Sequence, residues 1–174
     1  MIIFFMNQFK SILELNNIEE RNMDHTSVMT YFEIKGDNFP IEYVTKLLEI
    51  NPTNSYIKGE EIITTRKRKI IPIKRRYRTY TSWKLSTNYI ETLDANKQAK
   101  EIIGSLLSKV NELIAIKRIY ECEFVLMQVP IIENGCCSGI WYDQDVINFC
   151  SKIEASIEID LFANPYESDW DLDD

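Results

Sequence analysis

Histidine is almost absent from this sequence, because His25 is the only one among 174 residues. A Cys–His hydrolase or a Ser–His–Asp triad would have to use that single imidazole. His25 falls in a polar stretch that we predict to be a loop, and no G-x-S-x-G motif accompanies it. The phosphate-binding patterns G-x-G-x-x-G and G-x-x-x-x-G-K-[ST] are missing too. These absences disfavour an enzyme, so we assign no catalytic residue and expect no cofactor.

Cysteine is scarce and poorly spaced for a metal site. The adjacent pair Cys136 and Cys137 does not make a C-x-x-C motif, and no second pair stands at zinc-ribbon spacing. With one histidine in the chain, we expect no structural zinc and assign no metal ligand. The other two cysteines, Cys122 and Cys150, fall among apolar residues and are interpreted as small core side chains.

Long apolar runs and flexible segments are also missing. The longest apolar run, residues 1–6, is far shorter than the roughly 20 residues of a membrane span, and it makes a poor signal peptide. We therefore expect a cytoplasmic protein that has reduced cysteines and no membrane partner. Five glycines and five prolines predict no long linker. Met23 and Met29 are alternative start positions to Met1.

Charge is abundant and unevenly distributed. The chain carries 20 Lys and Arg against 27 Asp and Glu, a net charge of −7. Eight cations lie between Arg66 and Arg78 with no acid among them, which leaves 12 cations against 27 acids, or −15, elsewhere. An acidic body repels nucleic acid, so nucleic-acid binding through the basic segment 66–78 is the less favoured interpretation. The favoured interpretation is that its cations pair with the protein's own acids, and binding of an acidic protein partner is the second.

Apolar periodicity predicts an α+β fold, because alternating stretches indicate strands and three- or four-residue steps indicate helices. The predicted order is helix 7–21, strand 30–36, helix 41–48, strand 55–58, strand 76–86, helix 91–119, strand 121–130, a helix capped by Asp143, and strand 156–162. We predict a mixed or antiparallel sheet with helices packed on one face, ferredoxin-like, plus the N-terminal helix. A duplication of βαβ halves is an open alternative for its origin. The predicted parts are an N-terminal extension (1–29), one domain (30–163) with a basic insertion (60–76), and an acidic tail (164–174).

The predicted strands have faces of distinct chemistry. In strand 30–36, Tyr31, Glu33 and Lys35 share one face, opposite the apolar side chains. Strand 76–86 places Trp83 on its more apolar face, as a core residue or a ligand platform. The other face of that strand carries Arg76, Arg78, Tyr80, Ser82 and Lys84. In strand 156–162 the inward residues are Ile157, Ile159 and Leu161, and the outward acids, either solvated or metal-binding, are Glu158 and Asp160.

Several short blocks carry a family resemblance. They are F-E-I-K-G-D at 32–37, P-I-E-Y-V-T-K-L-L-E-I-N-P-T at 40–53, S-Y-I-K-G-E at 55–60, W-K-L-S-T at 83–87 and I-E-I-D-L-F at 157–162. Over residues 31–162 the chain resembles the bacterial domain of unknown function family 4279. The resemblance implies a small bacterial α+β domain with no agreed activity and no catalytic residues to transfer. Some members of that family lie near toxin genes, which would fit an immunity role.

These observations favour a non-enzymatic module that binds another protein, and its most specific form is an immunity protein that neutralises a toxin. Acidic surfaces suit the cationic clefts of nucleases. The alternative is a small-ligand or enzymatic domain with a pocket near Trp83. The oligomeric state stays open. The candidate binding residues are Lys58, Arg76, Arg78, Tyr80, Trp83, Trp141 and Tyr142.

Overall fold

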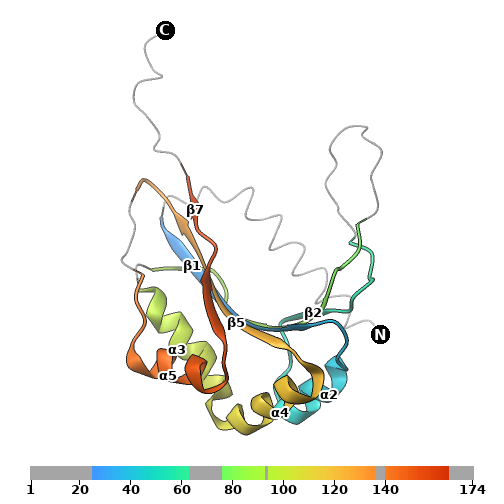
Figure 1. Cartoon of the computed structure of the whole chain (residues 1–174). Helices are drawn as coiled ribbons and strands as arrows, with labels where there is room; N and C mark the ends of the chain where they lie inside the picture. Colours follow the sequence, from blue (N-terminus) through green and yellow to red (C-terminus); the bar gives the residue numbers. More distant parts are fainter. Residues whose placement is uncertain (1–24, 63–75, 93, 136–139, 165–174) are drawn as a thin grey trace, which may run out of the picture.

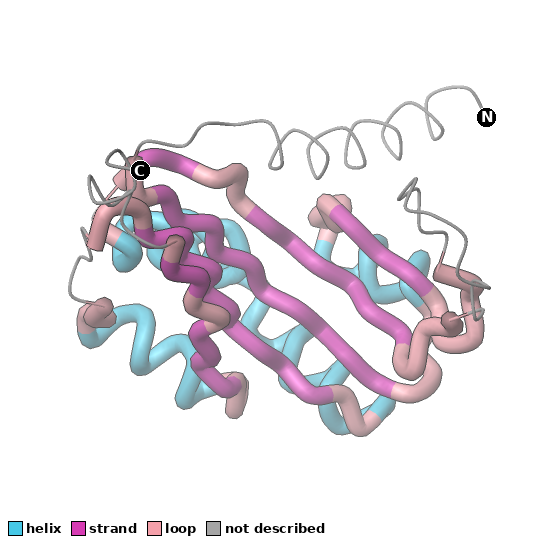
Figure 2. Tube along the Cα trace, turned by 90° about the horizontal axis from the view of Figure 1, so that it is seen from above, coloured by secondary structure: helices cyan, strands magenta, loops and turns pink. Residues whose placement is uncertain are grey.

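The computed structural model describes residues 25–62, 76–92, 94–135 and 140–164. It confirms the α+β class, with a seven-stranded mixed sheet and its helices on one side (Figures 1 and 2). The strands are β1 (Ser27–Gly36), β2 (Asn54–Tyr56), β3 (Thr81–Ser86), β4 (Ile90–Glu91), β5 (Glu123–Ile132), β6 (Ser156–Ile159) and β7 (Phe162–Ala163). The helices are α2 (Ile41–Leu48), α3 (Ala95–Leu106), α4 (Val110–Tyr120) and α5 (Gln144–Lys152).

The central strand of the sheet is β1, and the order across the sheet is β2-β3-β1-β5-β6. It runs antiparallel to both β3 and β5, while β4 pairs with its first two residues. After α5 the chain returns to the sheet as β6 and β7, both parallel to β5. The ferredoxin-like topology and the duplication of βαβ halves stay predictions.

The core lies between the sheet and the helices. Ile34 of β1 is in register with Trp83 of β3 on one side and with Phe124 of β5 on the other, so the three side chains share one face. All three are buried. The indole Nε1–H of Trp83 donates a hydrogen bond to the Thr45 hydroxyl of α2 at 3.0 Å, which satisfies the one polar group of a buried indole. Trp83 is therefore a core residue.

Several local predictions are confirmed. The carboxylate of Asp143 accepts a hydrogen bond from the backbone N–H of Val146, so it caps α5 as expected. Cys122 and Cys150 are buried free thiols in the core. The predicted helix 7–21, the basic residues 66–75, Cys136, Cys137 and the tail from residue 165 lie outside the described residues. In the described part of the chain, no helix is long and apolar enough to cross a membrane.

The single long helix predicted at 91–119 is wrong in its extent. Residues 90–91 pair with β1 as β4, Asp94 caps α3, and a 3₁₀ turn at Leu107–Lys109 separates α3 from α4. Leu106 and Val110 are both buried, so the apolar spacing runs through the turn and hides it. The break lets α3 cover β1 while α4 packs beside α2. Such breaks occur where a tighter 3₁₀ turn interrupts the α-helical ladder.

Two strand predictions also need correction. The regular part of strand 76–86 is only β3, and Tyr77 instead makes an isolated bridge to Glu61 at the base of a hairpin. Strand 156–162 is divided into β6 and β7, and Ile159 and Leu161 are 46% and 53% exposed despite their predicted inward position. This strand lies at the edge of the sheet, where neighbours cover it from one side only. Residues 140–142, which precede α5, are not in a strand.

Candidate functional site

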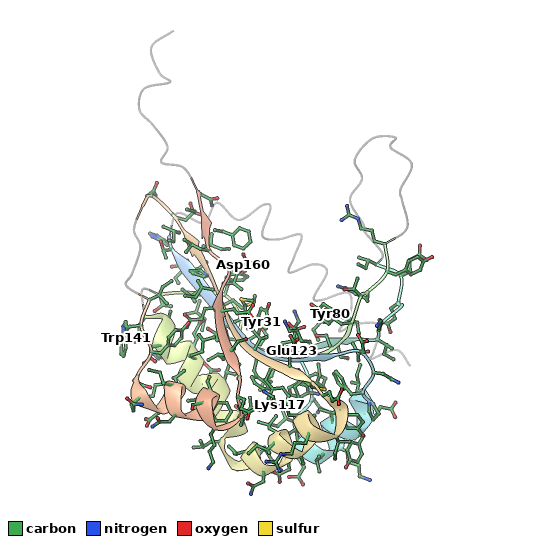
Figure 3. All side chains as sticks on the ribbon, in the orientation of Figure 1. Tyr31, Tyr80, Lys117, Glu123, Trp141 and Asp160 are labelled. Carbon is green, nitrogen blue, oxygen red and sulfur yellow. The ribbon has the colours of Figure 1, made fainter. Side chains whose placement is uncertain are left out.

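The side of the sheet opposite the helices, which we call the open face, gathers polar and aromatic side chains. Strand alternation places Tyr31 and Glu33 of β1 on this face, since Phe32 and Ile34 point into the core. The register sets Glu33 opposite Lys84 of β3. It also sets Tyr56 of β2 opposite Ser82, so three strands contribute to one cluster. Figure 3 shows Tyr31 and Tyr80 on this side of the sheet.

A buried carboxylate, that of Glu33, lies on the central strand of the open face. Glu33 is only 4% exposed, and its Oε1 accepts a hydrogen bond from the Ser82 hydroxyl at 2.5 Å. The ammonium of Lys84 lies 3.5 Å from the same oxygen and 4.4 Å from the centre of the Tyr31 ring. A buried charge is tolerated only when it is paired and hydrogen-bonded, which this arrangement provides. The two strands β1 and β3 therefore present Tyr31 and Lys84 in fixed positions.

The phenol of Tyr31 lies in a negative environment. Burial raises its pKa to about 12, and the nearby charges of Glu33, Glu158 and Asp160 act in the same direction. Glu158 lies on the open face because it is in register with Met127 of β5. Tyr31 therefore stays neutral at physiological pH, with the Lys84 ammonium against its ring and the carboxylates of Glu33, Glu158 and Asp160 nearby. Because Lys84 is paired with Glu33, the excess charge near Tyr31 is that of Glu158 and Asp160, which favours a cationic ligand over an anionic one.

An aromatic–cation group lies at the β2 side of the open face. The Arg78 guanidinium is 4.1 Å from the centre of the Tyr56 ring, and the Tyr56 and Tyr80 rings are 5.6 Å apart. Burial, followed by a hydrogen bond with Tyr80, raises the pKa of Tyr56 well above its usual value. Arg78 is fixed through its backbone, whose N–H donates to Glu60 O and whose carbonyl accepts from Gly59 N. Tyrosine and arginine held in this way are the residue types that anchor protein interfaces.

The predicted binding residues thus separate into distinct places. Arg78 and Tyr80 meet on the open face, whereas Arg76 is exposed at the hairpin base and its carbonyl accepts from Ile62 N. Lys58 is exposed and pairs with Asp37 at 2.9 Å. Trp83 is buried on the other side of the sheet.

Trp141 and Tyr142 lie at the far end of the sheet, before α5. Trp141 is 54% exposed. The hydroxyl of Tyr142 donates to the side-chain oxygen of Gln128 at 2.8 Å, and Gln128 is in register with Ile159 of β6. The loop with Trp141 is therefore anchored to β5 through Tyr142, and Figure 3 shows Trp141 at the outside of the molecule, on the side of α3 and α5.

The outer strand combines negative charge with exposed apolar side chains. We call residues 156–163 the acidic edge. Its exposed large apolar residues are Ile159, Leu161 and Phe162, and its acids are Glu158 and Asp160. Residues 140–164 hold five acids and a single cation, Lys152. An apolar surface rimmed by charge of one sign is typical of an interaction site.

The sequence alone did not show that Tyr31, Glu33, Tyr56 and Lys84 form one cluster. The alternation of each strand was visible, but the pairing of β1 with β3 and of β3 with β2 was not. Within the described residues, no group of three or more His, Cys, Asp or Glu side chains is placed to hold a metal ion. Burial raises the pKa of the thiols of Cys122 and Cys150 to about 11, so neither is a ready nucleophile.

Comparison with known families gives one result. Residues 25–164 match the family described as a domain of unknown function, DUF4279, which spans the sheet, the helices and both surfaces described above. The comparisons with curated proteins and with solved structures found no match.

Proposed function

Since the chain belongs to the DUF4279 family, whose description assigns no activity, we propose its function from the surfaces themselves. We propose that the protein is a non-enzymatic binding module for another protein, and that its partner presents a cationic surface to the open face and the acidic edge. The observation that carries the proposal is the position of the half-buried Tyr31 near Glu158 and Asp160, since Met127 of β5 is in register with Tyr31 on one side and with Glu158 on the other.

The composition of the surface supports a protein partner. Tyr31, Tyr56, Tyr80 and Arg78 offer rigid aromatic and guanidinium groups that are already ordered by the sheet. Side chains that are ordered before binding lose less conformational entropy in a complex. The acids of the edge, Glu158 and Asp160, add a field that speeds encounter with a cationic partner. We therefore expect the contact with the partner protein to be centred near Tyr31.

In its most specific form, the partner is a toxin encoded beside the gene for this chain, which would make the chain an immunity protein. A nuclease toxin has a cationic cleft for phosphates, and an acidic face can occupy it. The ligand-pocket alternative loses support because Trp83 lies in the core. Nucleic-acid binding has the least support, because the acids near Tyr31 repel phosphates.

The test uses the purified product of the adjacent gene, inactivated at its own active site if it is toxic. Its binding is measured by calorimetry at low and moderate salt. The double variant Glu158→Lys and Asp160→Lys should weaken binding about tenfold or more at low salt. The matched control, Glu42→Lys and Glu101→Lys on the helices, makes the same change in net charge and should stay within about twofold. Equal effects of the two pairs, or no binding at all, would refute the proposal.

A further inference from the structure

The acidic edge keeps one register with β5 along its whole length, although only β6 and β7 within it are regular strand. Val125 of β5 pairs with Ser156 and Gln128 with Ile159, while Ile131 pairs with Phe162. The difference between partner numbers is 31 in each pair, so no residue is inserted between β6 and β7. The N–H of Asp160 also donates to Gln128 O at 2.8 Å. Residues 156–163 therefore follow β5 over eight positions.

The outer hydrogen-bonding groups of this strand face away from the sheet. In a parallel ladder the backbone groups of successive residues point alternately to opposite neighbours. Asp160 N bonds to β5, and so does Asn164 N, which donates to Ile132 O at 2.9 Å. The N–H and C=O groups of Ile157, Ile159 and Leu161 consequently point outward. Among the described strands, none pairs with this side of β6.

The two faces of the edge carry different side chains, with only apolar residues on the helix side and the acids together with Phe162 on the open face. Ile157, Ile159 and Leu161 lie on the helix side, and the latter two are largely exposed. Glu158 and Asp160 lie on the open face. An exposed edge with apolar residues is a template for another strand, and charges along it restrict which strand can pair.

We propose that the cationic partner binds by adding a β-strand to residues 156–163, with alternating apolar and Lys or Arg side chains. The added strand pairs with the outward backbone groups of Ile157, Ile159 and Leu161. Its apolar residues cover the helix side of the edge, and its cations meet Glu158 and Asp160. This mode rests on the proposed function and specifies the partner's chemistry at the same surface.

A second copy of this chain is the less suitable occupant. Antiparallel pairing of two edges about a twofold axis at Ile159 would set Glu158 of one copy opposite Asp160 of the other, twice. Like charges directly opposite each other destabilise paired strands. In that register, which is centred on the edge, the two acids disfavour self-pairing, while they favour a cationic strand.

The probe is a ten-residue peptide of alternating lysine and valine. Every second amide is N-methylated, so that the peptide has one hydrogen-bonding edge and cannot assemble with itself. A peptide methylated at every amide is the control. Binding is followed by titration, and hydrogen exchange of the full chain reports the amides of Ile157, Ile159 and Leu161. The account expects protection of these three amides by the first peptide and none by the control.

The variant Ile159→Pro removes one outward N–H and leaves the bonds to β5 in place, because these use Asp160 and not Ile159. It should weaken peptide binding about tenfold or more, whereas Ile159→Ala keeps the N–H and should cost less than about threefold. Leu161→Pro repeats the test at a second outward amide, should Ile159→Pro lower the melting temperature.

The possible results separate the two proposals. If Ile159→Pro and Ile159→Ala weaken peptide binding equally and no amide is protected, strand addition is overturned. That result leaves the proposed binding of the adjacent gene product untouched, because the charge-reversal variants test it separately. Absence of peptide binding at low salt would also overturn strand addition. Protection that rises with concentration of the chain alone would show that a second copy occupies the edge, against the proposal.

Discussion

Removing the hydroxyl of Tyr142 tests whether this residue is a structural anchor. The hydroxyl donates to Gln128 Oε1 at 2.8 Å, and Gln128 is fully buried with its amide nitrogen donating to Ala95 O at 2.7 Å. Tyr142→Phe leaves the Gln128 oxygen without its partner inside the protein. An unsatisfied buried acceptor costs about 1–3 kcal/mol. Because Tyr142 itself is half-buried, we expect about 1–2 kcal/mol, or roughly 2–8 °C in melting temperature for a chain of this size.

The assay is urea unfolding, with Trp141→Phe as the control. The adjacent Trp141 is exposed, so its substitution should change the free energy of unfolding by less than about 0.5 kcal/mol. Gln128→Met should cost about 2–4 kcal/mol, since it leaves both Ala95 O and the Tyr142 hydroxyl unpaired. The double variant, Tyr142→Phe with Gln128→Met, should lose about 1 kcal/mol less free energy of unfolding than the sum of the two single losses. Additive losses, or an unchanged Tyr142→Phe protein, would refute this reasoning.

Three further predictions concern the core and the cap of α5. Thr45→Val removes the acceptor of the buried indole N–H of Trp83 and should cost about 1–2 kcal/mol in urea unfolding, whereas Thr45→Ser keeps the hydroxyl and should cost less. Native Cys122 and Cys150 should react with iodoacetamide at pH 8 far more slowly than after unfolding, as read by mass spectrometry of their peptides, because burial raises the pKa of both thiols. A hydrogen bond from a lysine of α3 lowers the pKa of Asp143 in the folded state. Its stabilising contribution is thus present above the unfolded pKa of about 3.9 and is lost as pH falls through the lower folded value, so Asp143→Asn should flatten the decline of stability below about pH 4. A decline in the variant as steep as in the wild type would contradict that assignment.

The elements that the sequence predicted well are those with a strong local signal. Strict alternation identified β1, and Pro40 and Asn51 bracketed α2. Asp143 was recognisable as a cap because its carboxylate precedes an apolar stripe. The break between α3 and α4 was hidden, since the apolar spacing from Leu106 to Val110 is the same in one helix or in two. Local patterns report which face is apolar, and they do not report where a helix must turn to follow the sheet.

The candidate surfaces depend on contacts that no local pattern contains. Glu33 and Ser82 are 49 positions apart in the sequence and meet through the pairing of β1 with β3. Tyr56 joins them because β2 pairs with β3. The exposure of Ile159 and Leu161 follows from the position of their strand at the sheet edge, which is a property of strand order. Sequence reasoning therefore named Arg78, Tyr80 and Trp141 as candidates without showing the surfaces on which they lie.

The central claim is that a cationic protein binds at the acidic edge beside the open face. Its most direct test is hydrogen exchange of the whole chain with and without a saturating amount of the adjacent gene product. The account predicts new protection at Ile157, Ile159 and Leu161, together with slowed exchange around Tyr31 in β1. Binding that instead protects the outer surfaces of α2 and α4, and leaves residues 156–163 unchanged, would contradict it.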